Sequence, residues 1–270
     1  MRKSRNLIVL ILLLSLLLLS GCGIKVGVEI YTYDDSNYSI GNKAFTEQIN
    51  EITIDWIAGN VFIEKSTNHE LIIREETDVN IEDKYKMHYL LDNNKLDIKF
   101  VASNKMLDYK FKVKNLYIFL PYEINDIEVN IVSADLEIKQ STIKDLEINN
   151  VSGEINIDSS TINIIEINNV SGDILLFNSR CEEVEIQTVS GNIGLSYLEN
   201  PKELSIESTS GDITLYIKET DSVGVEYNTV SGDFNSNINH KVINDKIEYN
   251  DPQLYYEIDT ISGDLTINKK

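Results

Sequence analysis

Cysteine, histidine and arginine are scarce in this chain. The only cysteines are Cys22 and Cys181, so one chain cannot build a disulfide framework or a cysteine-based zinc site. Histidine occurs three times, and Arg74 and Arg180 are the only arginines after residue 21. The sequence contains no nucleophile–base pair, glycine-rich phosphate loop or metal-ligand cluster. It therefore predicts no catalytic residue, no metal site, no cofactor and no enzymatic activity.

Basic residues are few relative to acidic ones. The chain has 24 lysines and arginines against 44 aspartates and glutamates, for a formal net charge of −20. Nucleic-acid binding needs a basic footprint, so this balance excludes it as a function. Electrostatic adsorption to anionic lipid is also disfavoured, because it depends on basic clusters.

The one long apolar run lies at the N-terminus. It extends from Leu7 to Leu19 behind three basic residues, and it is shorter than the roughly 20 residues that span a bilayer. It ends in Leu19-Ser-Gly-Cys22, a lipoprotein signal pattern. We expect residues 1–21 to be a removed signal peptide and Cys22 to be diacylated. Residues 22–48 would then be a flexible tether to the outer face of the cell membrane. Removing residues 1–21 takes away three positive charges and no negative ones, which shifts the net charge from −20 to −23.

A short motif recurs through the second half of the chain. A β-branched residue, a serine, a glycine or alanine, and an acid or amide follow one another seven times. The motifs begin at Val132, Val151, Val170, Val189, Thr209, Val230 and Ile261. Their serines lie 19, 19, 19, 20, 21 and 31 residues apart. A fixed period of about 20 residues is typical of a solenoid of stacked coils.

Within each repeat, apolar and polar residues alternate on both sides of the motif. Leu146 and Ile148 precede one corner, and Ile155 and Ile157 follow it, which indicates two short strands joined at a glycine. Three apolar columns recur at the same offsets. The first column is Ile127, Leu146, Ile165, Val184, Leu204, Val225 and Tyr256; the second is Val129, Ile148, Ile167, Ile186, Ile206, Tyr227 and Ile258; the third is Leu136, Ile155, Ile174, Ile193, Ile213, Phe234 and Leu265. We therefore predict an all-β fold, a single-stranded, right-handed parallel β-helix (β-solenoid) with about 20 residues per coil.

The predicted solenoid covers residues 49–270, with regular coils at 127–234. Looser coils fill 49–126, where Ile52 begins a first coil and Leu71 a second. The 31-residue interval after Ser231 predicts a loop or hairpin near 235–250, followed by a last coil at 254–270. Glycine at the corners is expected to supply a positive φ, with Ala134 as the exception.

One outward column is almost entirely acidic. This acidic stripe is Glu128, Glu147, Glu166, Glu185, Glu226 and Glu257. Stacked strands lie about 4.8 Å apart, and exposed like charges at that distance repel by roughly 1 kcal/mol before salt screening. Two interpretations stay open: a solvated face that keeps the protein soluble, and a docking site for a cationic peptide, a basic protein or divalent ions.

Two further groups of residues are expected to face outward. An acid or amide follows each corner glycine, and it is expected to bond local backbone at the turn. On the opposite face, Leu175, Phe177 and Tyr216 project outward and form a candidate apolar binding patch. Scattered surface aromatics are also common and need no function.

The serial motifs, together with Leu120-Pro121 ahead of them and a glycine-containing first coil, resemble a bacterial candidate-adhesin domain of unknown function. The resemblance covers about residues 50–270 and implies a parallel β-helix on the cell surface, often in lipoproteins or envelope-stress proteins. It carries no catalytic residues.

The expected function is a lipid-anchored surface module of the bacterial envelope, adhesin-like or structural. The expected partners are the membrane, through the N-terminal lipid, and an envelope protein, peptide or glycan. The first alternative is an envelope-stress regulator that captures cationic peptides or basic proteins on the acidic stripe. A carbohydrate-active enzyme is the less favoured alternative.

Overall fold

The computed structural model describes residues 32–104 and 114–270. The described residues fall into two units, one of residues 34–102 with 114–270 and one of residues 32–33 with 103–104. All described strands belong to the first unit. In the second, the Tyr33 backbone N–H donates a hydrogen bond of 2.9 Å to the Ser103 hydroxyl. Cys22, the predicted signal peptide and the first part of the predicted tether lie outside the described residues.

The repeating coil consists of two parallel strand segments joined by a corner. In one coil, β9 (Thr142–Ser152) buries Leu146 and Ile148, and β10 (Ile155–Asp158) buries Ile155 and Ile157. The next coil pairs with it in parallel at a shift of 19 residues. The predicted all-β parallel β-helix is confirmed, because almost every member of the three apolar columns is buried.

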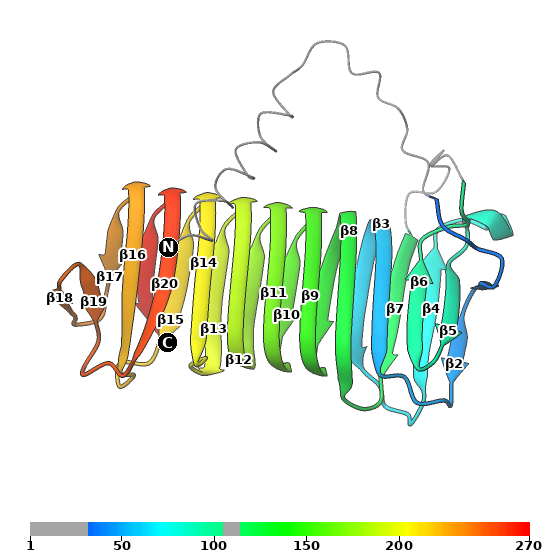
Figure 1. Cartoon of the computed structure of the whole chain (residues 1–270), viewed down its shortest axis with the longest axis horizontal. Helices are drawn as coiled ribbons and strands as arrows, with labels where there is room; N and C mark the ends of the chain where they lie inside the picture. The colour runs from blue at the N-terminus through cyan, green and yellow to red at the C-terminus, as the bar shows by residue number, and fades with distance from the viewer. Residues whose placement is uncertain (1–31, 105–113) are drawn as a thin grey trace, which may run out of the picture. The chain divides into compact units, whose positions relative to one another are not determined.

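The strand segments form two rows along the stack (Figure 1). We call the row before the glycine corners the pre-corner sheet and the row after them the post-corner sheet. In stacking order, the pre-corner sheet contains β6 (Lys95–Lys99), the first halves of β3 (Glu51–Lys65) and β8 (Ile124–Lys139), β9, β11 (Thr161–Ser171), the second half of β12 (Ile174–Ser190), β14 (Glu203–Ser210), β20 (Leu254–Ser262) and β16 (Val223–Ser231). The post-corner sheet contains β7 (Lys114–Leu120), the second halves of β3 and β8, β10, the first part of β12, β13 (Ile193–Glu199), β15 (Ile213–Ile217), β21 (Leu265–Lys269) and β17 (Phe234–Ser236).

The glycine corners need both an unusual φ and close packing between coils. Gly172 has a φ of +117°, and a Cβ on it would lie 2.1 Å from the Gly153 carbonyl oxygen of the adjacent coil. Ala134 occupies this position in an earlier coil without a positive φ, so that corner differs as expected. At Gly263 a Cβ would meet the Gly211 carbonyl oxygen at 2.1 Å although its φ is not positive, so close approach alone excludes a side chain there.

A second set of corners links the end of one coil to the start of the next. Gln140, Ser159 and Asn178 have φ values of +51°, +52° and +51°, and each precedes a buried serine. The Ser160 hydroxyl accepts a hydrogen bond of 3.2 Å from the Ser141 backbone N–H. The Ser160 backbone N–H in turn donates to the Ser179 hydroxyl at 3.1 Å. These corners replace a missing backbone partner by a stacked hydroxyl, which satisfies buried donors.

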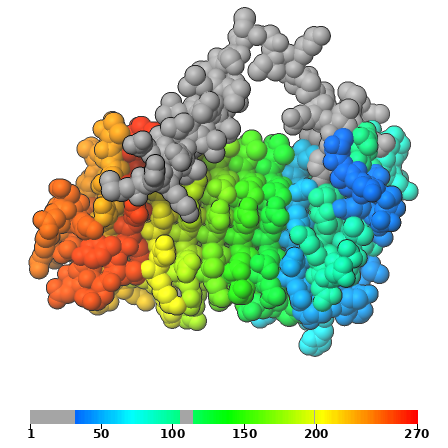
Figure 2. All heavy atoms as spheres, in the orientation of Figure 1, coloured from blue at the N-terminus to red at the C-terminus, as the bar shows by residue number. Residues whose placement is uncertain are grey.

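The order of coils at the C-terminal end differs from the order in sequence. We expected each coil to stack on the one before it. Instead, β20 pairs with β14 on one side and with β16 on the other, and β21 lies between β15 and β17 in the same way. The last coil is therefore inserted between the two coils that precede it (Figure 1), and space-filling bands repeat this order with red residues between yellow and orange ones (Figure 2). Beyond β16, β18 (Lys241–Ile243) and β19 (Lys246–Glu248) form the predicted antiparallel hairpin, and β19 pairs antiparallel with β16.

The N-terminal end is interleaved too. β3 pairs directly with β8, 75 residues later, while β6 and β7 lie on its other side. The coil predicted to begin at Leu71 is wrong, because β4 (Leu71–Thr77) runs antiparallel to β7. β5 (His88–Asp92), which follows the short 3-10 helix η1 (Asp83–Tyr85), is likewise antiparallel to β6. β1 (Ser39–Ile40) and β2 (Lys43–Phe45) pair with β5 and β4, respectively, so ordered strands begin before the predicted boundary at residue 49.

Within residues 32–104 and 114–270, no helix is long and apolar enough to cross a membrane.

Candidate binding face

The outward face of the pre-corner sheet aligns the acidic stripe. Glu128, Glu147, Glu166 and Glu185 are direct partners on four successive strands. The interleaved order then places Ser205 beside Glu185, followed by Glu257 and finally Glu226. All six predicted glutamates therefore lie in one line, and Glu226 forms an ion pair of 2.7 Å with Lys246.

A column of amides supports the stripe. Asn149 donates one hydrogen bond of 2.9 Å to the Glu147 carboxylate and another of 3.1 Å to the Asn130 amide oxygen. Asn168 continues the amide ladder to Asn149 at 3.1 Å, and Gln187 donates to Glu185 at 2.8 Å. Hydrogen bonds from neutral donors stabilise the carboxylates without removing their negative charge.

Near the middle of this face the amide column itself becomes acidic. Glu207 and Asp259 are neighbours on β14 and β20, beside Glu185 and Glu257 of the stripe. Partial burial, together with the carboxylates of Asp259, Glu185 and Glu257, raises the pKa of Glu207 above its ordinary value. The face is therefore short of positive charge at this point.

Beside the amide column lies a row of exposed aliphatic side chains that we did not predict as a site. They are the first residues of the motifs, aliphatic in six of the seven and exposed in five, and the serines that follow them pair in register. Val151 is 50% exposed and Val230 82% exposed. We call this row the aliphatic ladder; in stacking order it consists of Val132, Val151, Val170, Val189, Thr209, Ile261 and Val230. The signal was present in the repeated first letter of the motif, but we treated that letter only as part of the turn.

The acids after the corner glycines have a structural role. At five of the seven positions the side-chain oxygen of the aspartate or asparagine accepts a hydrogen bond from a backbone N–H of an adjacent coil, at 2.8 to 3.1 Å. The accepting residues are Asp135, Asp173, Asn192, Asp212 and Asp264. We expected bonds to local backbone, and the structure shows that they join coils instead.

The predicted apolar patch lies on the post-corner sheet. Phe177 and Tyr216 are on strands separated only by β13, with ring centroids 6.4 Å apart. Leu175 and Phe177 both lean over Gly194, which leaves them the space a side chain would fill. The structure thus brings the three residues together as a small half-buried cluster.

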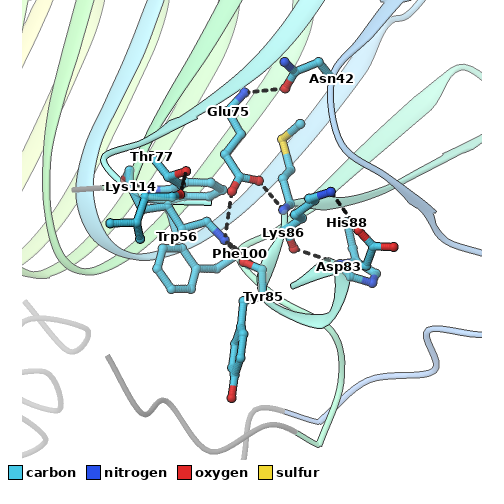
Figure 3. A network of polar contacts seen from close by, with 12 residues as sticks. Asn42, Trp56, Glu75, Thr77, Asp83, Tyr85, Lys86, His88, Phe100 and Lys114 are labelled. Atoms are coloured by element: carbon cyan, nitrogen blue, oxygen red, sulfur yellow. Dashed lines mark hydrogen bonds and ion pairs between the residues drawn. The ribbon is translucent and has the colours of Figure 1, made fainter. Parts of the chain in front are cut away.

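The most deeply buried charges lie at the N-terminal end (Figure 3). Lys114 is 1% exposed, its ammonium lies 3.5 Å from the Glu75 carboxylate, and it donates to the Tyr85 and Phe100 carbonyl oxygens. Burial lowers the pKa of Lys114 to about 8 and raises that of Glu75. Glu75 also lines a cavity of about 250 Å³ with Asn42 and other residues. Because Lys114 ties β7 to the segment that caps the solenoid, we assign the pair a structural role.

The remaining chemistry-bearing residues are dispersed. Burial raises the pKa of the Cys181 thiol to about 12, so it stays protonated. His240 packs edge-on against Phe234, and the His88 ring contacts the Lys86 carbonyl. In the part of the chain that the structure describes, no three His, Cys, Asp or Glu side chains are grouped so that they could hold a metal ion.

The fold and its faces define a parallel β-solenoid with an acidic and aliphatic outer face and without a recognisable catalytic centre in its described residues. Residues 108–268 match the Toastrack DUF4097 family, and the chain belongs to that family. No curated protein matched the sequence.

Several solved structures are similar to this chain. One is a candidate cell adhesion protein from Clostridium sporogenes, with 12% identity, a TM-score of 0.37, and coverage of 86% of this chain and 100% of that one. A candidate adhesin from Bacteroides fragilis has 15% identity, a TM-score of 0.44, and coverage of 85% and 97%. A candidate lipid-binding protein from Parabacteroides distasonis has 14% identity, a TM-score of 0.44, and coverage of 87% and 98%.

Proposed function

We propose that this chain is a non-enzymatic binding module of the bacterial envelope, adhesin-like and displayed outside the cell membrane by a lipid on Cys22. The observation that carries this proposal is the outward face of the pre-corner sheet. It combines an aligned acidic stripe with the aliphatic ladder, whose side chains are aliphatic on six of seven coils and exposed on five. Exposed apolar rows rimmed by charge mark interaction sites more often than they mark plain solvated surface. The partner is an envelope protein, peptide or glycan.

The proposal of a binding module rather than an enzyme rests on the sameness of neighbouring glutamates in the stripe. Acid–base catalysis needs carboxylates in different environments, one kept protonated and one ionised. Glu147 and Glu166 have the same neighbours on every side, an amide two residues on and a glutamate on each adjacent strand. Burial shifts the pKa values of Lys114 and Glu75, but the two side chains lie buried at the N-terminal end of the solenoid, away from the stripe.

The envelope-binding proposal can be tested by photo-crosslinking on intact cells. A photoreactive residue replaces Glu166 on the candidate face, and in a matched variant it replaces the exposed Asn235 on β17 of the other sheet. We expect a defined adduct from position 166 that is missing or weaker from position 235. Identical adducts from both positions, or none from either, would contradict a binding role for this face.

The lipid anchor is tested separately with Cys22→Ala. Because diacylation requires the cysteine thiol, this variant should be released from membranes or keep its signal uncleaved. Fractionation combined with intact-mass measurement distinguishes these results. Unchanged mass together with unchanged membrane retention would contradict the anchor while leaving the binding face untouched.

A second candidate function is capture of cationic peptides or basic proteins as part of an envelope-stress response. The crowding of Glu185, Glu207, Glu257 and Asp259 favours it, because these four carboxylates lie at neighbouring positions and form no ion pair with a cation among residues 32–104 and 114–270. Added positive charge from a partner would relieve their repulsion.

A further inference from the structure

We propose that the partner on the pre-corner face is a basic amphipathic α-helix of another polypeptide, lying along the solenoid axis. This inference deepens the proposed function and rests on it. It is carried by the parallel arrangement of the acidic stripe and the aliphatic ladder, with the amide column between them. The acidic stripe alone would indicate only that the partner is positively charged. The aliphatic ladder indicates in addition that the partner has an apolar side.

The charge on the face selects the sign of the partner. Four glutamates stand side by side from Glu128 to Glu185, and the adjoining region adds Glu207, Glu257 and Asp259. The described ion pair on the stripe is Lys246 with Glu226, at the far end of the row. Lysines or arginines of a partner placed over the stripe would meet carboxylates that already accept amide hydrogen bonds and are therefore held in place.

The aliphatic ladder selects an apolar side for the same partner. Val132, Val151 and Ile261 are about half exposed, and Val230 is more exposed still. A single exposed valine does not indicate a binding site, but here the same position is aliphatic on six of seven coils. A row of this kind gains free energy when apolar side chains cover it.

The spacing of the two rows matches the width of a helix. Glu147 and Val151 are four residues apart on β9, about 13 Å at the rise of an extended strand. An α-helix with its side chains is about 10 to 12 Å across, so it can rest over the amide column and reach both rows. Along the axis, helical turns repeat every 5.4 Å or so and coils every 4.8 Å or so, which keeps successive contacts near each other.

The length of the face gives the length of the partner. Seven positions of the aliphatic ladder span six strand spacings, about 29 Å. A helix of about 19 residues covers that distance at about 1.5 Å per residue. An extended peptide fits less well, because its side chains alternate sides and only every second residue would face the sheet.

Two other occupants are less compatible with this surface. A second copy of the chain carries the same excess of acid, with a net charge of −20 for the full sequence. An anionic lipid surface would also be repelled by the stripe. Both are included as outcomes of the test below.

The test uses the purified full chain and two synthetic peptides of the same lysine, leucine and alanine composition. In one peptide the lysines and leucines lie on opposite sides of a helix; in the other the same residues are shuffled so that both types surround it. We expect the amphipathic peptide to bind at least about tenfold more tightly by fluorescence anisotropy, and its affinity to fall as salt rises. Equal affinity for the two peptides would overturn the proposal, because charge alone would then explain binding.

Two triple variants locate the site. Glu147→Gln with Glu166→Gln and Glu185→Gln removes three charges of the stripe, and Val132→Ser with Val151→Ser and Val170→Ser removes three aliphatic contacts. Each should weaken binding of the amphipathic peptide about tenfold. A matched charge control is Glu137→Gln with Glu182→Gln and Glu199→Gln, three acids off the stripe that pair with lysine or arginine. This control should bind as the wild type does, and equal weakening by control and stripe variants would overturn the proposal.

The remaining outcomes separate this inference from the proposed function. Self-association of the chain measured by sedimentation, or binding to phosphatidylglycerol vesicles that is lost in the valine variant, would replace the helix by a second copy or a membrane. If the peptides show no preference while position 166 still crosslinks on cells, the helix inference fails and the binding module stands. If position 166 does not crosslink either, both fail.

Discussion

At the scale of single residues, each position in a coil has its own equivalent as its nearest neighbour on both sides. Ile186 lies between Ile167 and Ile206, and Glu185 lies between Glu166 and Ser205. At most positions a substituted side chain therefore contacts the same type of residue in both adjacent coils. Adjacent residues on one strand consequently have opposite tolerance to charge.

Ile186→Asp and Glu185→Lys form a matched pair for this point. Ile186 is 1% exposed, so an aspartate there buries an unpaired charge and should cost about 3 kcal/mol or more of unfolding free energy. Glu185 is exposed, and a lysine there relieves repulsion within the stripe, so stability should stay the same or rise slightly. Urea unfolding of the two proteins gives the comparison, and similar midpoints would contradict the inward and outward assignment.

Glu207 provides a prediction of pH dependence at the residue scale. Burial and the nearby carboxylates raise its pKa in the folded protein above the unfolded value of about 4.5. Between those two pKa values the folded state binds more protons than the unfolded state, so stability falls as pH rises through this interval. Glu207→Gln should be more stable than the wild type at pH 7, and the difference should shrink towards pH 4. A difference that grows on acidification would show that the carboxylate is stabilised by the fold.

At the scale of elements, the chain fastens both ends of the stack by changing the order of its coils. β3, from the first coil, has β6 and β7 on one side and β8 on the other. β20 and β21, from the last coil, lie between strands that precede them in sequence. Each terminal coil is therefore held by a segment distant in sequence. Antiparallel strands then cover the outer coils, which limits the exposed strand edges that promote aggregation.

Because of this order, the coil that precedes the last one in sequence, β16 and β17, depends on the last coil, β20 and β21, for its parallel strand pairing. Truncation after residue 253 removes β20 and β21, and with them the parallel partners of β16 and β17. In hydrogen exchange, amides of residues 227–236, which do not pair with β19, should lose their protection, while those of residues 124–190 keep it. Full protection of residues 227–236 after truncation would show that pairing with β20 and β21 does not protect them, which would contradict the interleaved order.

Sequence periodicity predicted which side chains face inward but not which coils are neighbours. Ile206 and Ile258, for example, belong to one apolar column and make equivalent contacts in any order of coils, so the column carries no information about succession. The reversal of β4 was missed for a related reason, because Leu71 and Ile73 alternate as well in an antiparallel strand as in a parallel one. The acidic stripe was predictable from alternation, whereas the aliphatic ladder was hidden in the turn motif.

At the scale of the whole molecule, the chain combines a proposed lipid at Cys22, a solenoid, and one outward face with rows of different chemistry. The solenoid repeats a weak surface group at intervals of about 4.8 Å until the row is long enough to hold a partner. A single exposed aliphatic residue or glutamate contributes little to binding, but six of the seven coils present both in register.

The most direct measurement of the central claim is labelling of introduced cysteines by a membrane-impermeant maleimide. Val170→Cys places a thiol on the aliphatic ladder, and Asn235→Cys places one on the other sheet; the native Cys181 is buried, at 3% exposed, so it should stay unlabelled. We predict that both variants are labelled on intact cells, and that labelling of Val170→Cys, but not of Asn235→Cys, is several-fold slower on cells than in the purified chain. Absence of labelling on cells at both positions would contradict display outside the membrane, and equal rates at the two positions would contradict a partner on this face.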